Sequence, residues 1–165
     1  MTDDIAERFQ QLEKRVSSLE DQVAIYQLMA AYGPAADSGS TQDAIKLWAN
    51  DGVYDLHTQV MKGRNGIAEE LEGEWHQGLI AKGSAHIVSM PHVVIEGDKA
   101  VATCHSRLYR REDDSGYRVL SCSANRWEMT RVDGRWRVDR RISRRLDGSE
   151  ESHRVLAASQ SLKKL

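Results

Sequence analysis

The sequence predicts an α+β domain: a cone-shaped, curved antiparallel sheet whose pocket is enclosed by three helices from the first half of the chain. Two observations support this prediction. Apolar residues recur at helical spacing through the first part of the chain, whereas in the second half they alternate with polar residues over long runs. Short turn sequences, EGDK and VDGR, join those alternating runs, as in antiparallel hairpins. Helices over the concave face of a bent sheet leave one open mouth, with a pocket inside.

Composition narrows the class of protein. A chain of 165 residues is long enough for one domain with a substantial core. Its formal net charge of -2 gives no reason to expect nucleic acid or an anionic membrane as a partner. The charged start, MTDDIAERFQ, lacks the apolar segment of a signal peptide, and no apolar run would span a bilayer, so we expect a cytoplasmic location. Cys104 and Cys122 fit no metal-binding spacing and are expected to be reduced thiols.

The first helix is predicted to extend to about Tyr32, where Gly33 and Pro34 should end or kink it. Its apolar residues are spaced alternately by four and three positions, which is a heptad pattern. They are Ile5, Phe9, Leu12, Val16, Leu19, Val23 and Tyr26. Two interpretations stay open. Residues 1–17 form a helical extension that packs on a partner chain, or the helix is amphipathic and lies on its own sheet.

The middle of the chain predicts two further helices and a strand. Ser40 and Asp43 resemble a capping box, so a second short helix is expected over 41–51. Residues 52–58 alternate and are rich in strand formers, which favours a strand. A turn then leads into a third helix at about 66–77.

Four long antiparallel strands are expected in the second half. Two lie within 85–111, on either side of EGDK, and two within 116–145, on either side of VDGR. Pro91 interrupts the first of them and indicates a bulge or an edge position. The segment 148–165 is a polar tail with a frayed helix.

Polar side chains interrupt several of these apolar strands. Because side chains alternate along a strand, His86 shares a face with Val88 and Met90, and Ser123 shares a face with Asn125. His105 follows an apolar run in the same way. Either these faces are simply solvated, or they line a cavity in which a few polar groups converge on a small molecule.

At this point the sequence resembles the SnoaL-like branch of the nuclear transport factor 2-like superfamily, which has a cystatin-like fold. The resemblance covers about 18–145, in the motifs LEDQVAIYQLMAAYGPAADSGSTQDAIKLWANDGVYD, GSAHIVSMPHVVIEGDKAVA and RVDGRWRVDRR. It implies a SnoaL-like domain over 18–147. By motif, the chain is most similar to scytalone dehydratase and bile-acid 7α-dehydratase, which are lyases that work without a cofactor or metal. Related lyases are commonly trimers, so a homo-oligomer is expected, with a trimer favoured over a dimer.

The resemblance implies specific residues. The lyases pair an Asp after the first helix with a His on a later strand, and these correspond to Asp37 and His86. Tyr54, His105, Ser123 and Asn125 stand at places that match scytalone dehydratase. That family has a Tyr directly before its Asp, where this chain has Ala36; Tyr32 instead matches the bile-acid enzyme. An Arg on the last strand is also implied, and Arg140, Arg141 and Arg144 all remain candidates.

These residues fit the elimination of water next to a carbonyl. A base removes a proton, a donor stabilises the enolate oxygen, and an acid protonates the leaving hydroxyl. His suits base and acid, and a carboxylate that accepts its other N–H fixes the tautomer. Alternatively Asp37 is only a helix cap and His86 a structural residue. The predicted catalytic set is Asp37, His86, His105, Tyr54 and Tyr32, and the predicted substrate-binding set is Ser123, Asn125, Arg140, Trp136, Val88 and Met90.

The function expected is therefore a cofactor-independent dehydratase of a small, apolar, cyclic hydroxy-ketone. A double-bond isomerase with the same pocket and a non-catalytic binding domain are the alternatives. No metal is expected, because the lyases that the sequence resembles work without one. His57, His76, His92 and His153 are interpreted as surface or structural residues.

Overall fold

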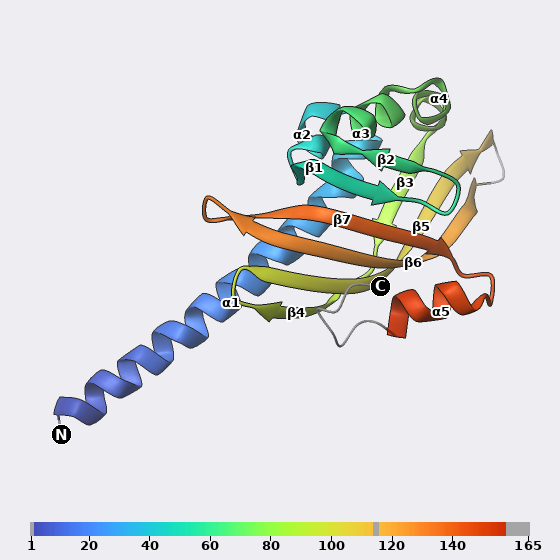
Figure 1. Cartoon of the computed structure of the whole chain (residues 1–165). Coiled ribbons are helices and arrows are strands. Elements are labelled where there is room, and N and C mark those ends of the chain that lie inside the picture. Colours follow the sequence, from blue (N-terminus) through green and yellow to red (C-terminus); the bar gives the residue numbers. More distant parts are fainter. Residues whose placement is uncertain (1, 114–115, 158–165) are drawn as a thin grey trace.

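The computed structural model describes residues 2–113 and 116–157, and it confirms an α+β domain with a curved sheet (Figure 1). Its first half contains α1 (Thr2–Asp37), α2 (Thr41–Ile45), β1 (Trp48–Asp55), β2 (Val60–Lys62), α3 (Gly63–Glu72) and α4 (Glu74–Lys82). The second half contains β3 (Ser84–Val88), β4 (His92–Glu96), β5 (Lys99–Glu112), β6 (Gly116–Val132), β7 (Arg135–Arg145) and α5 (Glu150–Ala157).

The strands form one sheet in the order β2-β1-β7-β6-β5-β3, and β4 also pairs with β5. Neighbouring strands are antiparallel except for β1 and β7, which are parallel. β3 and β4 pair with different halves of β5, residues 106–110 and 99–103. Pro91 lies between them, and both strands are at an edge of the sheet, so of the expected bulge or edge position the structure shows the edge.

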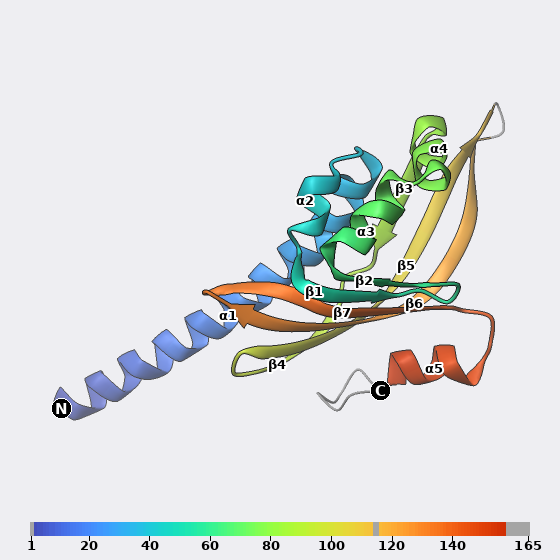
Figure 2. The same ribbon diagram turned by 45° about the horizontal axis from the view of Figure 1, so that its top comes forward.

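Helices cover both faces of the sheet. The end of α1, together with α2, α3 and α4, covers the concave face, and α5 lies on the other side (Figure 2). The main core is on the concave side, where the fully buried Trp48 and Trp127 stack on each other, and Tyr32 and Tyr54 pack against them edge-on and tilted. A smaller cluster joins α5 to the back of the sheet through Val155. The concave side is thus filled by aromatic residues at one end and open at the other.

Helix α1 passes through Pro34 and ends at Asp37, so the expected end at Gly33 was wrong. Proline disfavours a helical conformation of the preceding residue partly through a clash with that residue's Cβ, which glycine lacks. Gly33 also touches β3, since a Cβ built on it would lie 2.1 Å from the carbonyl oxygen of His86. The helix therefore approaches the strand closely at the point where both enter the pocket.

The first-half helices differ from those expected. Ser40 precedes α2, but its side chain makes no capping bond, so the capping box was wrong. α2 is short because Trp48, expected in that helix, already belongs to β1. The third helix divides at Gly73, which has an extended backbone. Within the described residues, four helices instead of three therefore precede β3. Helix α5 falls in the predicted tail, whose residues 158–165 lie outside the described part.

The contact at Gly33 predicts the effect of adding one methyl group. We expect Gly33→Ala to destabilise the fold by about 2 kcal/mol or more, because rigid backbone of β3 occupies the space. Gly78→Ala is the matched control: Gly78 lies inside α4 with nothing within 4 Å of a built Cβ, and the change should stabilise by roughly 0.5–1 kcal/mol. Urea unfolding of both variants measures the difference; equal effects would contradict the close approach of α1 and β3.

Candidate active site

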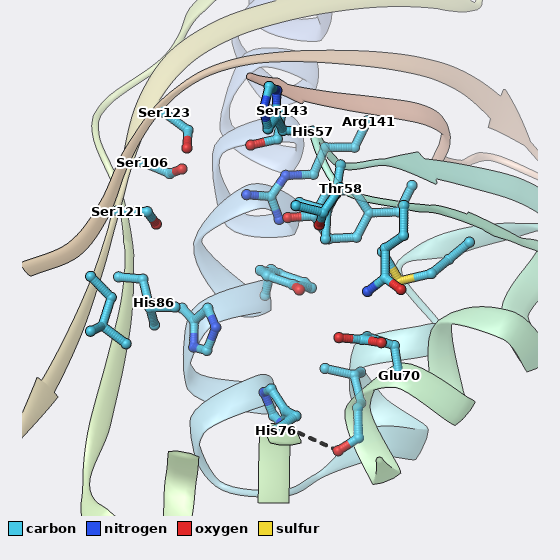
Figure 3. Close-up of a pocket in the computed structure, with 18 of the residues that line it drawn as sticks. His57, Thr58, Glu70, His76, His86, Ser106, Ser121, Ser123, Arg141 and Ser143 are labelled. Atoms are coloured by element: carbon cyan, nitrogen blue, oxygen red, sulfur yellow. Dashed lines mark hydrogen bonds between the residues drawn. The ribbon is translucent and has the colours of Figure 1, made fainter. Parts of the chain in front are cut away.

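A pocket of about 570 Å³ opens between the concave face of the sheet and helices α1, α3 and α4. Its apolar wall includes Leu56, Met61, Ile67, Leu71, Val88 and Leu108. Polar groups project into it from opposite sides, with His86 and His76 at one side and Arg141 across the cavity (Figure 3). A volume of this size suits a small cyclic molecule.

Asp37 and His86 form a hydrogen-bonded pair at the edge of this pocket. The ring Nδ1–H of His86 donates to Asp37 Oδ1 at 2.7 Å, and the backbone N–H of His86 donates to Oδ2 at 2.7 Å. Ser84 Oγ donates to the same carboxylate at 2.7 Å. With Nδ1–H committed to Asp37, the neutral ring has its other nitrogen, Nε2, without a proton. The ring of His86 projects into the cavity (Figure 3).

Asp37 is not a helix cap. It is the last residue of α1, where the helix dipole disfavours a negative charge, and the last turn contains no basic residue. Burial alone raises the pKa of the Asp37 carboxyl. Hydrogen bonds from the His86 ring, the His86 backbone and Ser84 outweigh burial, so the net pKa lies below its usual value. The carboxylate is therefore charged and held by β3.

His76 also belongs to the pocket, although the sequence interpretation left it as surface or structural. It is buried on α4, and its Nδ1 is 2.9 Å from the carbonyl oxygen of Leu71. Its Nε2 is buried and has no hydrogen-bond partner among the described residues. Burial, followed by the charge of His86, lowers the pKa of His76, and the two ring centroids are 5.5 Å apart. His76 is therefore a neutral ring with an available acceptor. The spacing of His76 and Leu79 on one helix face was the only sequence signal for its burial.

Arg141 is the buried cation of the site. It is 3% exposed, and its Nε–H donates to Asn125 Oδ1 at 3.0 Å. Its guanidinium carbon lies 4.3 to 4.7 Å from the ring centroids of Tyr32, Tyr54 and Trp127. Its Nη1 is buried without a hydrogen-bond partner in the described part of the chain. Burial raises the pKa of the Tyr32 and Tyr54 phenols, and Arg141 opposes this effect in both. Both tyrosines are therefore neutral donors beside a fixed positive charge.

A bulge in β7 explains why Arg141, and not Arg140, enters the pocket. Met129 pairs with Val138, and the adjacent Glu128 pairs with Arg140, so Asp139 is one extra residue on β7. An extra residue reverses which side chains face the core. Val138 and Arg141 therefore both point inward. Strict alternation along β7 would place Val138 and Arg140 on one face, and the choice of Arg140 was wrong; Arg140 instead pairs with Asp55 at 2.7 Å, outside the pocket lining.

The remaining predicted residues divide into two groups. Tyr32, Tyr54, Ser123 and Val88 line the pocket, and Asn125 lies behind it, where its amide nitrogen donates to Ser106 Oγ at 2.7 Å. The structure contradicts the expectations for His105, Met90 and Trp136, which do not line the pocket.

His105 is exposed, because successive side chains of β5 point to opposite faces and its neighbour Ser106 faces the pocket. Met90 is 79% exposed because it lies in the break between β3 and β4. Trp136 is buried at the far end of the core, where its indole N–H donates to Asp21 at 3.1 Å. None of the three lines the pocket, so each was wrongly placed by the sequence interpretation.

Further polar groups line the cavity that the sequence interpretation did not select. Glu70 projects from α3, and Ser106, Ser121 and Ser143 join Ser123 along the sheet wall (Figure 3). Among the described residues, no group of three or more His, Cys, Asp or Glu side chains is arranged to hold a metal ion. No described helix is long and apolar enough to cross a membrane.

Residues 17–142 match the family model of the SnoaL-like domain. The chain belongs to the SnoaL-like family, within the nuclear transport factor 2-like superfamily. That family includes polyketide cyclases, dehydratases and isomerases. No curated protein sequence matches the chain.

Solved structures agree with this family. An NTF2-like protein with a cystatin-like fold from Novosphingobium aromaticivorans is 39% identical, with a TM-score of 0.85 over 88% of this chain and 94% of its own. A protein of unknown function from Mycobacterium tuberculosis is 18% identical, with a TM-score of 0.71 over 87% of this chain and 88% of its own. Aln2 from Streptomyces is 17% identical, with a TM-score of 0.70 over 78% of this SnoaL-like chain and 92% of its own. The last two show similarity of fold only.

The lowered pKa of Asp37 predicts a pH-dependent loss of stability. Because the pKa is lower in the folded state, the ionised carboxylate stabilises the fold above the unfolded-state pKa, and this stabilisation disappears as the pH falls through the folded-state pKa. The free energies of unfolding of wild type and Asp37→Asn should therefore differ most above about pH 5, and they should converge only as the pH falls through the folded-state pKa of Asp37, which lies below its usual value of 3.8. Urea unfolding across this range measures the difference.

Asp43→Asn provides the control for this pH series. Asp43 forms an exposed ion pair with Lys46 at 3.0 Å, and exposed pairs contribute little. Its effect should be small throughout the range. A difference for Asp37→Asn that stays constant down to low pH would contradict the ionised pair.

Proposed function

We propose that this SnoaL-like protein is a cofactor-independent dehydratase that eliminates water from a cyclic, mostly apolar hydroxy-ketone. The observation that supports this most directly is the arrangement of two unlike groups around one apolar cavity. His86, oriented by Asp37, lies on one side, and the buried Arg141 lies on the other beside two neutral phenols. A base and an oxygen-binding cation on opposite sides of a substrate are what α-proton removal requires.

In the proposed reaction, Nε2 of His86 removes the proton on the carbon next to the substrate carbonyl. The electron pair moves onto the carbonyl oxygen, which becomes an enolate. Arg141, with Tyr32 and Tyr54, stabilises the negative charge on that oxygen. Asp37 balances the positive charge of the imidazolium that His86 becomes.

The second step returns the proton. As the enolate collapses, the bond from the β-carbon to the hydroxyl breaks, and the imidazolium of His86 protonates the departing oxygen. The products are an enone and one water, and His86 is neutral again. In this proposal the ring of His76, whose centroid lies 5.5 Å from that of His86, shapes the place that the hydroxyl occupies. The apolar wall selects a ring system, and the serines on the sheet wall orient its polar substituents.

The resemblance to scytalone dehydratase and bile-acid 7α-dehydratase supports the same chemistry. Asp37 and His86 correspond to the pair that those lyases share, and Tyr32 corresponds to a residue of the bile-acid enzyme, which also uses an Arg on its last strand. Since the family also includes isomerases, product mass separates the two reactions: dehydration lowers the mass by one water, and isomerisation leaves it unchanged.

The base is tested with two histidine variants of this SnoaL-like protein. Wild type, His86→Ala and His105→Ala are incubated with a panel of cyclic hydroxy-ketones, and mass spectrometry follows the loss of water. We expect His86→Ala to reduce turnover by about 10²–10⁴-fold, the contribution typical of a general base. His105→Ala is the matched control, because this exposed His lies outside the pocket lining and should retain wild-type rates. Equal loss in both variants would contradict the assignment of the base.

The cation is tested separately with Arg141→Met, which keeps much of the side-chain volume but removes the charge. If Arg141 stabilises the enolate, kcat should fall by about 10²-fold or more, whereas KM should change little. Arg140→Met is the control, because Arg140 pairs with Asp55 outside the pocket lining. Thermal unfolding of each variant confirms that the fold remains intact at the assay temperature. A change in KM alone would assign Arg141 to ground-state binding.

A further inference from the structure

The first half of α1 has an apolar stripe that its own domain leaves uncovered. Six residues form this stripe, which we name the α1 seam, and each is 51–66% exposed. They are Ile5, Phe9, Leu12, Val16, Leu19 and Val23. The helix projects away from the rest of the molecule along this segment (Figures 1 and 2). The expectation that the helix lies on its own sheet therefore applies only to its second half.

The seam also faces away from the domain where α1 begins to pack. Asp21 accepts hydrogen bonds from Arg131 at 2.6 Å, and Ile25 is fully buried. These residues follow Leu19 and Val23 by two positions, which is about 200° around a helix. The domain therefore holds one side of α1 and leaves the seam on nearly the opposite side, where another helix can approach it.

The charges beside the seam are complementary for one orientation of two identical helices. Arg8 and Arg15 directly precede seam residues, and Glu13 and Glu20 directly follow seam residues. In heptad terms the arginines occupy g positions and the glutamates e positions. In a parallel pair, g of one helix meets the following e of the other, which brings Arg8 to Glu13 and Arg15 to Glu20. An antiparallel pair would instead bring arginines together and glutamates together.

The seam residues favour two helices over three. The a positions hold Phe9, Val16 and Val23, and the d positions hold Ile5, Leu12 and Leu19. β-branched residues at a with leucine at d favour parallel dimers, and Val16, Val23, Leu12 and Leu19 fit this rule, whereas Phe9 and Ile5 do not. In the single chain Arg8 contacts Asp4 at 3.3 Å, but both side chains are largely exposed. Breaking this ion pair to form one with Glu13 of the second copy therefore costs little free energy.

We propose that the α1 seam binds a second copy of this chain as a parallel, two-stranded coiled coil. Residues 5–23 form about three heptads, and the domain fixes the following turns of the same helix. This anchoring reduces the cost of helix nucleation that makes short isolated coiled coils marginal. The two domains lie on the same end of the coiled coil, with their pockets outside it. The proposal is independent of the reaction in the pocket.

Charge-reversal variants of the full chain test the pairing. The Arg8→Glu/Arg15→Glu variant carries only glutamates beside the seam, and Glu13→Arg/Glu20→Arg carries only arginines. We expect wild type to have the mass of a dimer in light scattering, and each double variant to dissociate with a Kd raised at least about tenfold, because attractive pairs become repulsive. Mixing the two double variants, or combining all four changes in one chain, should restore the dimer. Circular dichroism verifies that each variant keeps its helices.

Cysteine cross-linking tests the orientation. In a Cys122→Ser background, which leaves only the buried Cys104, Ile5→Cys should form a disulfide-linked dimer on oxidation, because a parallel pair aligns Ile5 with its copy. An antiparallel pair would place it near Val23, roughly 27 Å away along the helix. Glu7→Cys, on the opposite side of the helix, is the matched control and should cross-link far less.

Each outcome of these experiments either supports or overturns the parallel dimer. A dimer that responds to charge reversal and cross-links at position 5 supports the proposal. A monomeric wild type, the trimer expected from the related lyases, a dimer insensitive to both double variants, or equal cross-linking at positions 5 and 7 would each overturn it.

Discussion

The Asp37 carboxylate is the contact on which the geometry of the pocket depends. It joins the end of α1 to the start of β3 through three hydrogen bonds of 2.7 Å, two of them from His86. A negative charge at a helix C-terminus is unfavourable, so this residue is stabilised by the strand and not by its own helix. The absence of a Cβ at Gly33 lets the two elements approach closely enough for these bonds to form. The close approach of α1 to β3 at Gly33 therefore also fixes the orientation of the His86 ring.

Much of the fold and part of the site could be predicted from the sequence. The curved sheet, its turns and the pairing of Asp37 with His86 follow from periodicity, turn chemistry and resemblance to a family. Arg141 and His76 could not be found in this way. Arg141 depends on the bulge at Asp139, and His76 depends on the division of a helix at Gly73. The bulge inserts one residue and reverses which β7 side chains face inward, and the break at Gly73 begins a new helix on which His76 is buried; strict periodicity along the chain anticipates neither.

The same reasoning explains the errors at His105, Met90 and Trp136. Met90 and Trp136 were selected from alternation along their strands and His105 from the resemblance, in each case without knowing where β3 ends or how far the pocket extends along each strand. Trp136 does face the concave side, but it lies at the far end of the core, where it contacts Asp21 of α1. Distance along a strand matters as much as the face, and it is fixed only when the register of neighbouring strands is known.

The buried charge of Arg141 is unfavourable for folding but favourable for the proposed reaction. Within the described residues no carboxylate is hydrogen-bonded to its guanidinium, and removing such a group from water without a counter-ion is costly. Three aromatic rings and Asn125 offset part of that cost. A buried carboxylate would offset more, but it would also neutralise the charge that an enolate needs. In the proposed reaction, the cost left uncompensated in the free protein is recovered when negative charge develops on the substrate oxygen. An interaction that strengthens in the transition state raises kcat, which tight binding of the ground state does not achieve.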